Sequence, residues 1–379
     1  MAALYGTSKR IILAALLILA AACGSADSSA GSPDAVAIGA ALNPQGGSGI
    51  ESMYRGIELA IEHLNAERGG KGPPFIMRRT PDDITGSVQI ASILRDDPRV
   101  VGVVGHQGSA PTLDAKAIYE DRERNGERAL VAVSPAATSP ALSGASPWLF
   151  RVCPSDLDVS RVAARYVLDS LKVHRAAVIY RSDPFGKDWT RSFSEHFTKG
   201  GGQVLVSNPY LAGVVEWEAY AAQLRRLRPD VILFPGSGPD AAEAIRALRR
   251  VGADYPFIGS DNVSTLERHG DEFAGVRYTA FFVPSRASTS EGRAFASAFE
   301  RRFHEPPDQQ AALAYDAALV IGRAVLAVGP DRKRVRSWIE QVGRKSPAMR
   351  GATGSIGFDE RHDVQHQTVM VQPIGGPRS

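Results

Sequence analysis

The chain has 379 residues, of which 44% are hydrophobic and 22% are charged, a composition that excludes a disordered or collagen-like protein. Its mean hydropathy is -0.14, and its main apolar run, Ile11 to Ala22, is shorter than the roughly 20 residues that span a membrane. Lys9 and Arg10 precede that run, and the remaining chain carries 42 basic and 41 acidic side chains. Such a balanced charge gives no electrostatic reason to expect a nucleic-acid partner.

The N-terminus has the charged, apolar and small-residue regions of a secretory signal peptide, which we place at residues 1–22. The segment Leu19-Ala20-Ala21-Ala22-Cys23 resembles a bacterial lipobox, although Ala20 stands where Leu is common. We therefore expect Cys23 to be lipidated and residues 23–35 to form a small, polar tether to the membrane. The alternative is a simple signal peptide cleaved within the alanines.

Cys153 is the second of the two cysteines in the sequence. If Cys23 is lipidated, Cys153 has no intramolecular disulfide partner. It follows the apolar run Trp148-Leu149-Phe150 and precedes Pro154, so we expect a buried, inert thiol.

From residue 36 onward, short β-rich runs alternate with amphipathic helical patterns, which is typical of an α/β fold. The runs lack period-2 alternation, which indicates parallel sheets covered on both faces, and their number suggests two sheets in two lobes. The expected strands are residues 36–42, 100–104, 129–133, 176–180, 204–207, 231–234 and 278–283. The expected helices are residues 52–66, 159–171, 217–227, 241–251, 291–303, 309–328 and 334–342.

The C-terminal part changes character, because residues 355–359 and 368–371 resemble two strands of an antiparallel hairpin. His362 and His366 are four residues apart, a spacing that would suit zinc on a helix. Here they fall in the predicted hairpin turn among charged residues. We therefore expect no metal site.

The motifs of common enzymes are absent from the sequence. No Ser has Gly at both flanking positions of a nucleophile elbow, and no strand is followed by a P-loop. The glycines at 46–49 lack the dinucleotide-binding spacing. These absences favour a binding protein without a cofactor over an enzyme.

In parallel α/β sheets, ligands collect beyond the carboxyl ends of the strands, near helix N-termini. Four predicted loops lie there and carry polar or small residues: 105–112 with Ser109, 134–140 with Ala136, Ala137 and Thr138, 154–158 with Asp156, and 260–262 with Asp261. Each of Ser109, Asp156 and Asp261 could equally be a helix cap.

The order of motifs resembles the leucine/isoleucine/valine-binding protein family, the amino-acid branch of type I periplasmic binding proteins that serve ABC importers. The resemblance runs from about Val36 to Ile374. It rests on residues 105–109, 118–121, 134–138, 150–151, 156, 185–186, 314–317 and 357–359.

The resemblance implies a two-lobe fold with three hinge crossovers that closes on a small ligand. It places residues 36–155 and 284–348 in lobe 1, and residues 156–283 and 349–374 in lobe 2. By position, Ser109, Ala137 and Thr138 would hold the α-carboxylate of an amino acid, with Ala136 beside them. Asp156 and Asp261 would hold its α-ammonium group.

The sequence departs from the family pattern at the expected pocket wall. Asp261 is one methylene shorter than the Glu often found there, and Phe185 lacks the hydroxyl of a common Tyr. Ser237 and Gly49 stand where aromatic residues are expected. Fewer rings predict a larger pocket with weaker apolar selectivity.

The resemblance therefore implies an exported, lipid-anchored, monomeric solute-binding protein, periplasmic or on the outer face of the cytoplasmic membrane. It would capture a branched-chain or related amino acid and deliver it to an ABC permease. The alternative is a ligand-sensing receptor subunit of the same fold that signals to a membrane partner.

Overall fold

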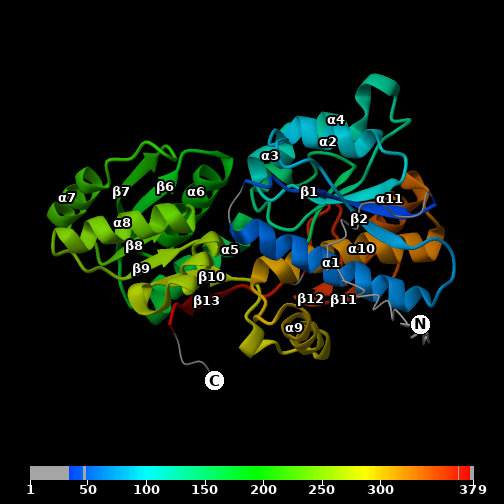
Figure 1. Cartoon of the computed structure of the whole chain (residues 1–379). Coiled ribbons are helices and arrows are strands. Elements are labelled where there is room, and N and C mark those ends of the chain that lie inside the picture. The colour runs from blue at the N-terminus through cyan, green and yellow to red at the C-terminus, as the bar shows by residue number, and fades with distance from the viewer. Residues whose placement is uncertain (1–33, 46–47, 366, 376–379) are drawn as a thin grey trace, which may run out of the picture.

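The computed structural model describes residues 34–45, 48–365 and 367–375 of the chain. The predicted signal peptide, Cys23, most of the predicted tether and His366 lie outside these residues. The described chain forms two lobes, each built on one sheet (Figure 1).

The first sheet is entirely parallel and has the order β2-β1-β3-β4-β5. Its central strands β1 and β3 are unbroken apolar runs, because helices cover both faces of the sheet and neither face needs to be polar. In chain order they are β1 (Val36–Ala41), β2 (Phe75–Arg79), β3 (Val100–Gly105), β4 (Ala132–Ser134) and β5 (Leu149–Arg151).

The second sheet has the order β13-β10-β9-β8-β6-β7, and only β13 runs antiparallel to its neighbour. Its strands are β6 (Arg175–Arg181), β7 (Gln203–Tyr210), β8 (Val231–Phe234), β9 (Phe257–Gly259), β10 (Arg277–Ala280) and β13 (Met370–Pro373).

Helices cover both faces of the first sheet. Helices α1 (Ser48–Arg68), α10 (Gln309–Val328) and α11 (Arg332–Gln341) pack on one face, and α9 (Ser290–Phe303) lies outside α1. The other face carries α2 (Ser87–Asp96), α3 (Ser109–Asp114) and α4 (Lys116–Glu120). The chain therefore returns to this lobe after completing most of the second sheet.

The second sheet is covered in the same way. Helices α5 (Asp156–Arg165) and α6 (Pro184–Lys199) lie on one face, and a π-helical turn, Tyr166–Ser170, continues α5. The other face carries α7 (Trp217–Leu227), α8 (Gly238–Arg250) and the 3₁₀ segment η4 (Asp261–Phe273).

One apolar core runs through both lobes, whereas the outer face of each sheet has a core of its own. Val152 and Cys153, which follow β5, and Phe281, which follows β10, are buried in the shared core at the crossovers. This confirms the predicted burial of Cys153, and burial raises the pKa of its thiol.

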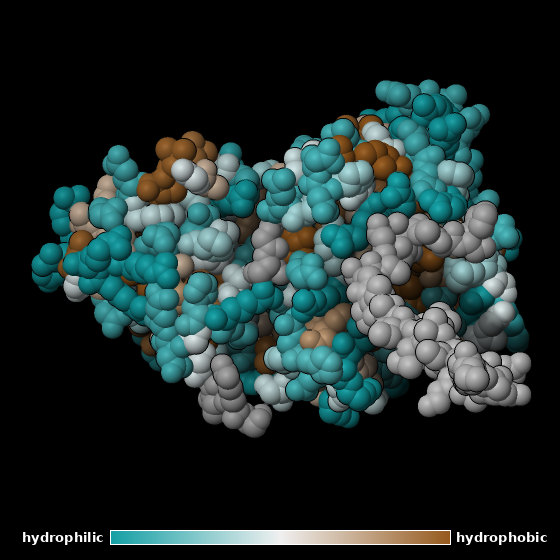
Figure 2. Space-filling view, in the orientation of Figure 1, coloured by the Kyte–Doolittle hydropathy of each residue, from teal (hydrophilic) through white to brown (hydrophobic). Residues whose placement is uncertain are grey.

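Helix α10 is the described helix that has the length and apolarity to cross a membrane. Its most apolar window is 78% buried inside the fold, where it packs against α1 and the first sheet. A central core helix meets the same criteria of length and composition, so this helix is weak evidence for a membrane span. The face shown in Figure 2 is mostly hydrophilic, with small separate hydrophobic patches on both lobes.

The predicted fold class is confirmed, and several helices match closely, including 217–227 and 309–328. The predicted C-terminal hairpin is wrong. β12 (Gly354–Ile356) pairs with β11 (Met349–Gly351), and β13 instead pairs with β10 of the second sheet. The predicted division gave residues 349–374 to the second lobe, but β11 packs against α9 and α10, and β12 pairs with β11.

The pairing error has a clear physical cause. β13 runs antiparallel to β10, which lies about 90 residues earlier in the sequence, so no turn signal marks the pair. The β11–β12 turn is fixed by Asp316 of α10, whose carboxylate accepts hydrogen bonds from the Ala352 and Thr353 N–H groups at 2.6 and 2.9 Å. The local alternation of polar and apolar residues predicts neither of these contacts.

Candidate functional site

The loop after β4 is held from within the first lobe by Ser134. Its hydroxyl donates to the carbonyl oxygen of His106 at 2.7 Å and accepts from the Ala137 N–H at 3.0 Å and the Ala136 N–H at 3.4 Å. The amides of both alanines are therefore engaged in shaping the loop. Burial lowers the pKa of His106 to about 3, so its imidazole is neutral beside the Tyr119 hydroxyl.

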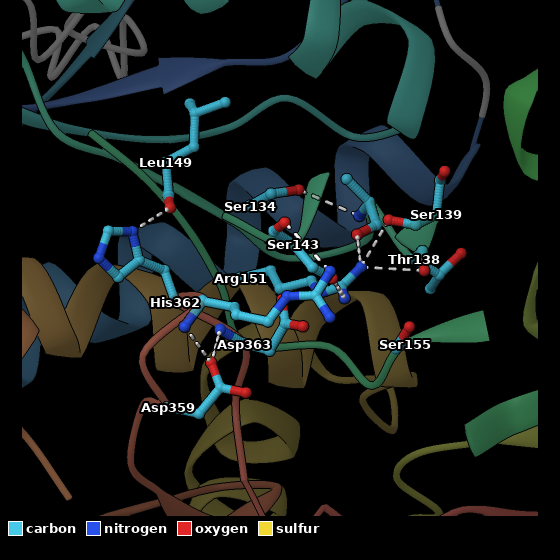
Figure 3. A network of polar contacts seen from close by, with 12 residues as sticks. Ser134, Thr138, Ser139, Ser143, Leu149, Arg151, Ser155, Asp359, His362 and Asp363 are labelled. Carbon is cyan, nitrogen blue, oxygen red and sulfur yellow. Dashed lines mark hydrogen bonds and ion pairs between the residues drawn. The ribbon is translucent and has the colours of Figure 1, made fainter. Parts of the chain in front are cut away.

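Arg151, the last residue of β5, holds the same loop from below (Figure 3). Its guanidinium donates to the carbonyl oxygens of Thr138 at 2.9 Å and Ser139 at 2.8 Å, and more weakly to that of Ala137 at 3.3 Å. Its Nε lies 2.8 Å from a carboxylate oxygen of Asp363. The side chain is 3% exposed, so this buried charge is matched by one carboxylate and several carbonyl dipoles.

Ser109 and Thr138 meet at the carboxyl edge of the first sheet. Ser109 begins α3, is 4% exposed, and accepts a hydrogen bond from the Ser139 N–H at 3.1 Å. Thr138 is equally buried, and its N–H has no partner among the described residues. The structure thus brings together a hydroxyl and a backbone N–H that can donate to an anion.

Asp156, the first residue of α5, lies directly against this loop. Its N–H donates to the carbonyl oxygen of Thr138 at 2.8 Å. The side chain is fully buried, yet neither carboxyl oxygen has a geometrically acceptable hydrogen-bond partner among the described residues. Burial raises the pKa of this carboxyl well above its usual range; the Thr138 hydroxyl and Arg151 oppose the shift, and Asp261 adds to it.

Asp261 is a second buried carboxyl, in the second lobe. It begins η4 after β9 and is 2% exposed. Burial raises its pKa to about 7, against the opposing hydrogen bonds of its own N–H and that of Asn262. Its charge also raises the pKa of Asp156, so the two buried carboxyls disfavour each other's ionised form.

The remaining predicted residues, Phe185 and Ser237, lie at the starts of α6 and α8. Phe185 is half-buried. Ser237 is the N-cap of α8: its hydroxyl accepts from the Asp240 N–H at 3.2 Å and donates to the Asp240 carboxylate at 2.6 Å. Contact of either residue with a ligand stays a prediction.

A polar contact already joins the lobes near this site. The Ser139 hydroxyl, in the first-lobe loop, donates to the carboxylate of Asp188 in α6. Helices α3 and α6 also lie against each other. The two lobes therefore touch each other beside the loop that carries Thr138.

The sequence motifs predicted no role for Arg151 or Asp363. The available signal was a charged residue between apolar Phe150 and Val152, which predicts a buried cation in need of partners. The predicted absence of a metal site stands as a prediction: within the described ranges, no three potential ligands cluster. His362 instead stacks on Phe150 and contacts backbone carbonyls.

The family model described as "periplasmic binding protein" matches residues 14–377. The chain belongs to this family. The Leu/Ile/Val/Thr-binding protein of Salmonella typhimurium is 28% identical over 219 residues, 57% of this chain and 58% of the relative. The match thus spans little more than half of that relative's length. The Leu/Ile/Val-binding protein homolog 1 of Brucella abortus is 26% identical over 318 residues, 82% of each chain.

Solved structures of the family share the fold. The branched-chain amino acid transporter substrate-binding protein LivJ from Streptococcus pneumoniae, in complex with isoleucine, has a TM-score of 0.81 at 20% identity, covering 91% of this chain and 98% of its own. A solute-binding protein of R. palustris in complex with benzoate has a TM-score of 0.78 at 20% identity, covering 90% and 94%. At such identities the likeness shows the fold alone.

Proposed function

We propose that this family member is the extracytoplasmic solute-binding protein of an ABC importer, and that it captures a free amino acid between its lobes. The observation that carries the proposal is the buried carboxyl of Asp156, which has no acceptable hydrogen-bond partner in the described chain. A buried carboxylate without a partner is costly, so the site is built for a ligand that supplies a cation.

The neighbouring groups define the rest of the ligand. The Ser109 hydroxyl and the Thr138 N–H can donate to a carboxylate, and Asp261 adds a second acceptor for an ammonium group. An α-amino acid carries these two charges on one carbon. Its carboxylate would lie against the first lobe and its ammonium group between the two aspartates.

The relatives support this choice of ligand class in different ways. The curated relatives are named for Leu, Ile, Val and Thr, and the LivJ structure holds isoleucine. The benzoate complex shows a carboxylate ligand on the same fold. Benzoate has no ammonium group to pair with Asp156, so the paired carboxyls favour amino acids over aromatic acids.

Export, lipidation at Cys23, delivery to a permease and a monomeric state belong to the same proposal. They rest on the N-terminal sequence and on the family, since residues 1–33 lie outside the described chain. Mass spectrometry of the protein expressed in a bacterial membrane tests the anchor: a diacylated Cys23 N-terminus supports it, and an unmodified cleavage product contradicts it.

A thermal-unfolding panel tests the ligand class. Protein lacking residues 1–23 is unfolded, refolded to remove carried-over ligand, and heated with each proteinogenic amino acid and with benzoate. A ligand at 100 times its Kd adds about 2.7 kcal/mol of stability, a rise of several degrees in Tm. A selective rise with amino acids supports the proposal. A rise with benzoate alone would contradict it.

A further inference from the structure

Gln309, the first residue of α10, makes an unusual set of contacts for a helix terminus. It is 2% exposed, and its carboxamide bonds two separate segments of the second lobe. The oxygen accepts from the Phe281 N–H at 2.9 Å, just after β10. The nitrogen donates to the Asp261 carbonyl oxygen at 2.8 Å and reaches the Ser264 hydroxyl at 3.2 Å.

The rest of α10 belongs to the first lobe. The helix packs along α1 and contacts β1, β3 and β4. Phe281 lies where the chain leaves the second sheet toward η5 (Pro284–Arg286) and α9. The Gln309 carboxamide therefore connects three parts of the molecule: a first-lobe helix, one crossover and the loop that carries Asp261.

The position of the Asp261 carboxyl depends on that loop. Asp261 is the first residue of η4, so its side chain moves with the backbone of that loop. The Asp261 carbonyl oxygen accepts hydrogen bonds from Gln309 and from the Ser264 hydroxyl, the latter at 2.6 Å. Removing Gln309 would remove one of the side-chain contacts to this peptide unit.

We propose that Gln309 is a positioning residue for ligand capture: it fixes Asp261 relative to the carboxylate-binding edge of the first lobe. The inference rests on the proposed function, in which Asp261 and Asp156 share the ligand's ammonium group. Gln309 itself touches no ligand. It sets the distance between the acidic side chains and the Ser109–Thr138 edge when the lobes are closed.

The adjacent residue, Asp308, supports the same junction from the solvent side. Its carboxylate caps α10 by accepting from the Ala311 N–H at 2.9 Å. It also accepts from the Ser52 hydroxyl of α1 at 2.8 Å and from Arg268 of η4 at 3.1 Å. Two consecutive residues at the start of α10, the capping Asp308 and the first helical residue Gln309, thus hold η4 against the first lobe.

The test compares Gln309→Ala with Gln310→Ala and Asp156→Asn, by calorimetric titration with the panel amino acid that binds the wild-type protein tightest. Gln310 is the matched control, because it is the next residue of α10 and is 4% exposed, but no described hydrogen bond joins its side chain to the second lobe. Loss of a buried hydrogen bond that positions a charged group predicts about tenfold or greater weakening for Gln309→Ala. Gln310→Ala is expected to bind as wild type.

Gln309→Glu adds a readout that a merely structural residue would not move. Above neutral pH its carboxylate faces the Asp261 carbonyl oxygen and cannot donate, whereas the protonated acid at low pH can. The Kd ratio of variant to wild type should therefore fall toward one as pH is lowered. Asp261, Asp308 and Arg268 are common to both proteins, so the ratio removes the part of their contributions that the substitution leaves unchanged. This nearly isosteric variant also serves if Gln309→Ala fails to fold.

Three results would overturn the inference. They are wild-type affinity in Gln309→Ala, equal weakening in Gln310→Ala, and a Gln309→Glu ratio that does not change with pH. If these occur while Asp156→Asn abolishes binding, the proposed function stands and only the positioning role fails. If Asp156→Asn also binds as wild type, or if no panel amino acid binds, both fail.

Discussion

Two neighbouring buried parts of the candidate site differ in how their polar groups are paired. In the loop at 134–139, several buried groups are paired inside the protein. The Ser134 hydroxyl accepts from the Ala137 N–H, and the Ser109 hydroxyl accepts from the Ser139 N–H. Arg151 donates to carbonyl oxygens of the loop. Asp156 lies against this loop, and both of its carboxyl oxygens lack acceptable partners in the described chain. The polar groups of the loop are thus mostly paired without a ligand, whereas the Asp156 carboxyl is not.

This difference shows how a binding site can combine a rigid backbone with a polar group that lacks a hydrogen-bond partner. The satisfied loop acts as scaffold, since its shape is set by internal hydrogen bonds at a buried location. The unsatisfied carboxyl lowers the stability of the ligand-free protein and gains most when a cation arrives. Changes to the scaffold should therefore act first on folding, and changes to Asp156 first on binding.

Arg151→Met gives the largest expected effect, a loss of about 3–5 kcal/mol in the free energy of unfolding. It leaves the Asp363 carboxylate and the carbonyls of the 137–139 loop without their shared cation. Urea unfolding measures the loss. The matched control is Arg181→Met, because Arg181 pairs with Asp183 at 3.0 Å but is 45% exposed, and its removal should cost less than about 1 kcal/mol. Equal losses would show that the Arg151 network is not special.

Asp156→Asn should weaken amino-acid binding by about 2–5 kcal/mol, because the ligand's ammonium group loses a buried charged partner. The same change should raise the Tm of the ligand-free protein at pH 8, where the native carboxyl resists ionisation. Calorimetric titration and thermal unfolding of one preparation measure both. Weaker binding together with lower ligand-free stability would indicate that Asp156 is part of the scaffold.

Ligand affinity should fall as pH is lowered below about 7. The pKa of Asp261 is raised to about 7 by burial, and an ammonium ligand requires the ionised form. The loss approaches about tenfold per pH unit, and binding near pH 6 should release a proton. Titrations in buffers of different ionisation enthalpy detect that proton. A Kd independent of pH between 5.5 and 8 would contradict the assignment of Asp261 to the ammonium group.

The contribution of Asp261 to the stability of the ligand-free protein should change with pH in the opposite sense. A carboxyl whose pKa is raised by folding retains its proton in the native state after the unfolded chain has released it, so its contribution to stability falls as pH rises from about 4 to 7. Asp316, with a pKa raised to about 6 by burial in α10, contributes the same sign. Asp261→Asn should remove only its own part of the slope, and an unchanged slope would contradict the raised pKa.

Ser237→Ala should have the smallest effect. Its hydroxyl caps α8 through Asp240, so removing it is expected to cost about 1 kcal/mol of stability. If Ser237 only caps α8, the ligand affinity of the Ser237→Ala variant stays as in the wild type. Strongly weakened binding would instead confirm the predicted ligand contact and place Ser237 with Asp156.

The sequence by itself predicted many of the strands and helices and the sheet edge at which the candidate site residues lie. Apolar runs without period-2 alternation gave parallel, covered sheets, because the local pattern reflects burial on both faces. Ser109, Thr138, Asp156 and Asp261 could be singled out because the carboxyl ends of parallel strands share one edge of a sheet. These inferences need only the local chain and one rule of topology.

The tertiary structure alone decided which polar groups are satisfied. Asp363 meets Arg151 from more than 200 residues away, Gln309 reaches the Asp261 loop across 48 residues, and β13 joins β10 rather than the expected hairpin partner. Pairing between distant segments is set by how whole lobes pack, and it leaves no periodic trace in the sequence. The same packing left Asp156 buried without an acceptable partner in the described chain, which no local pattern encodes.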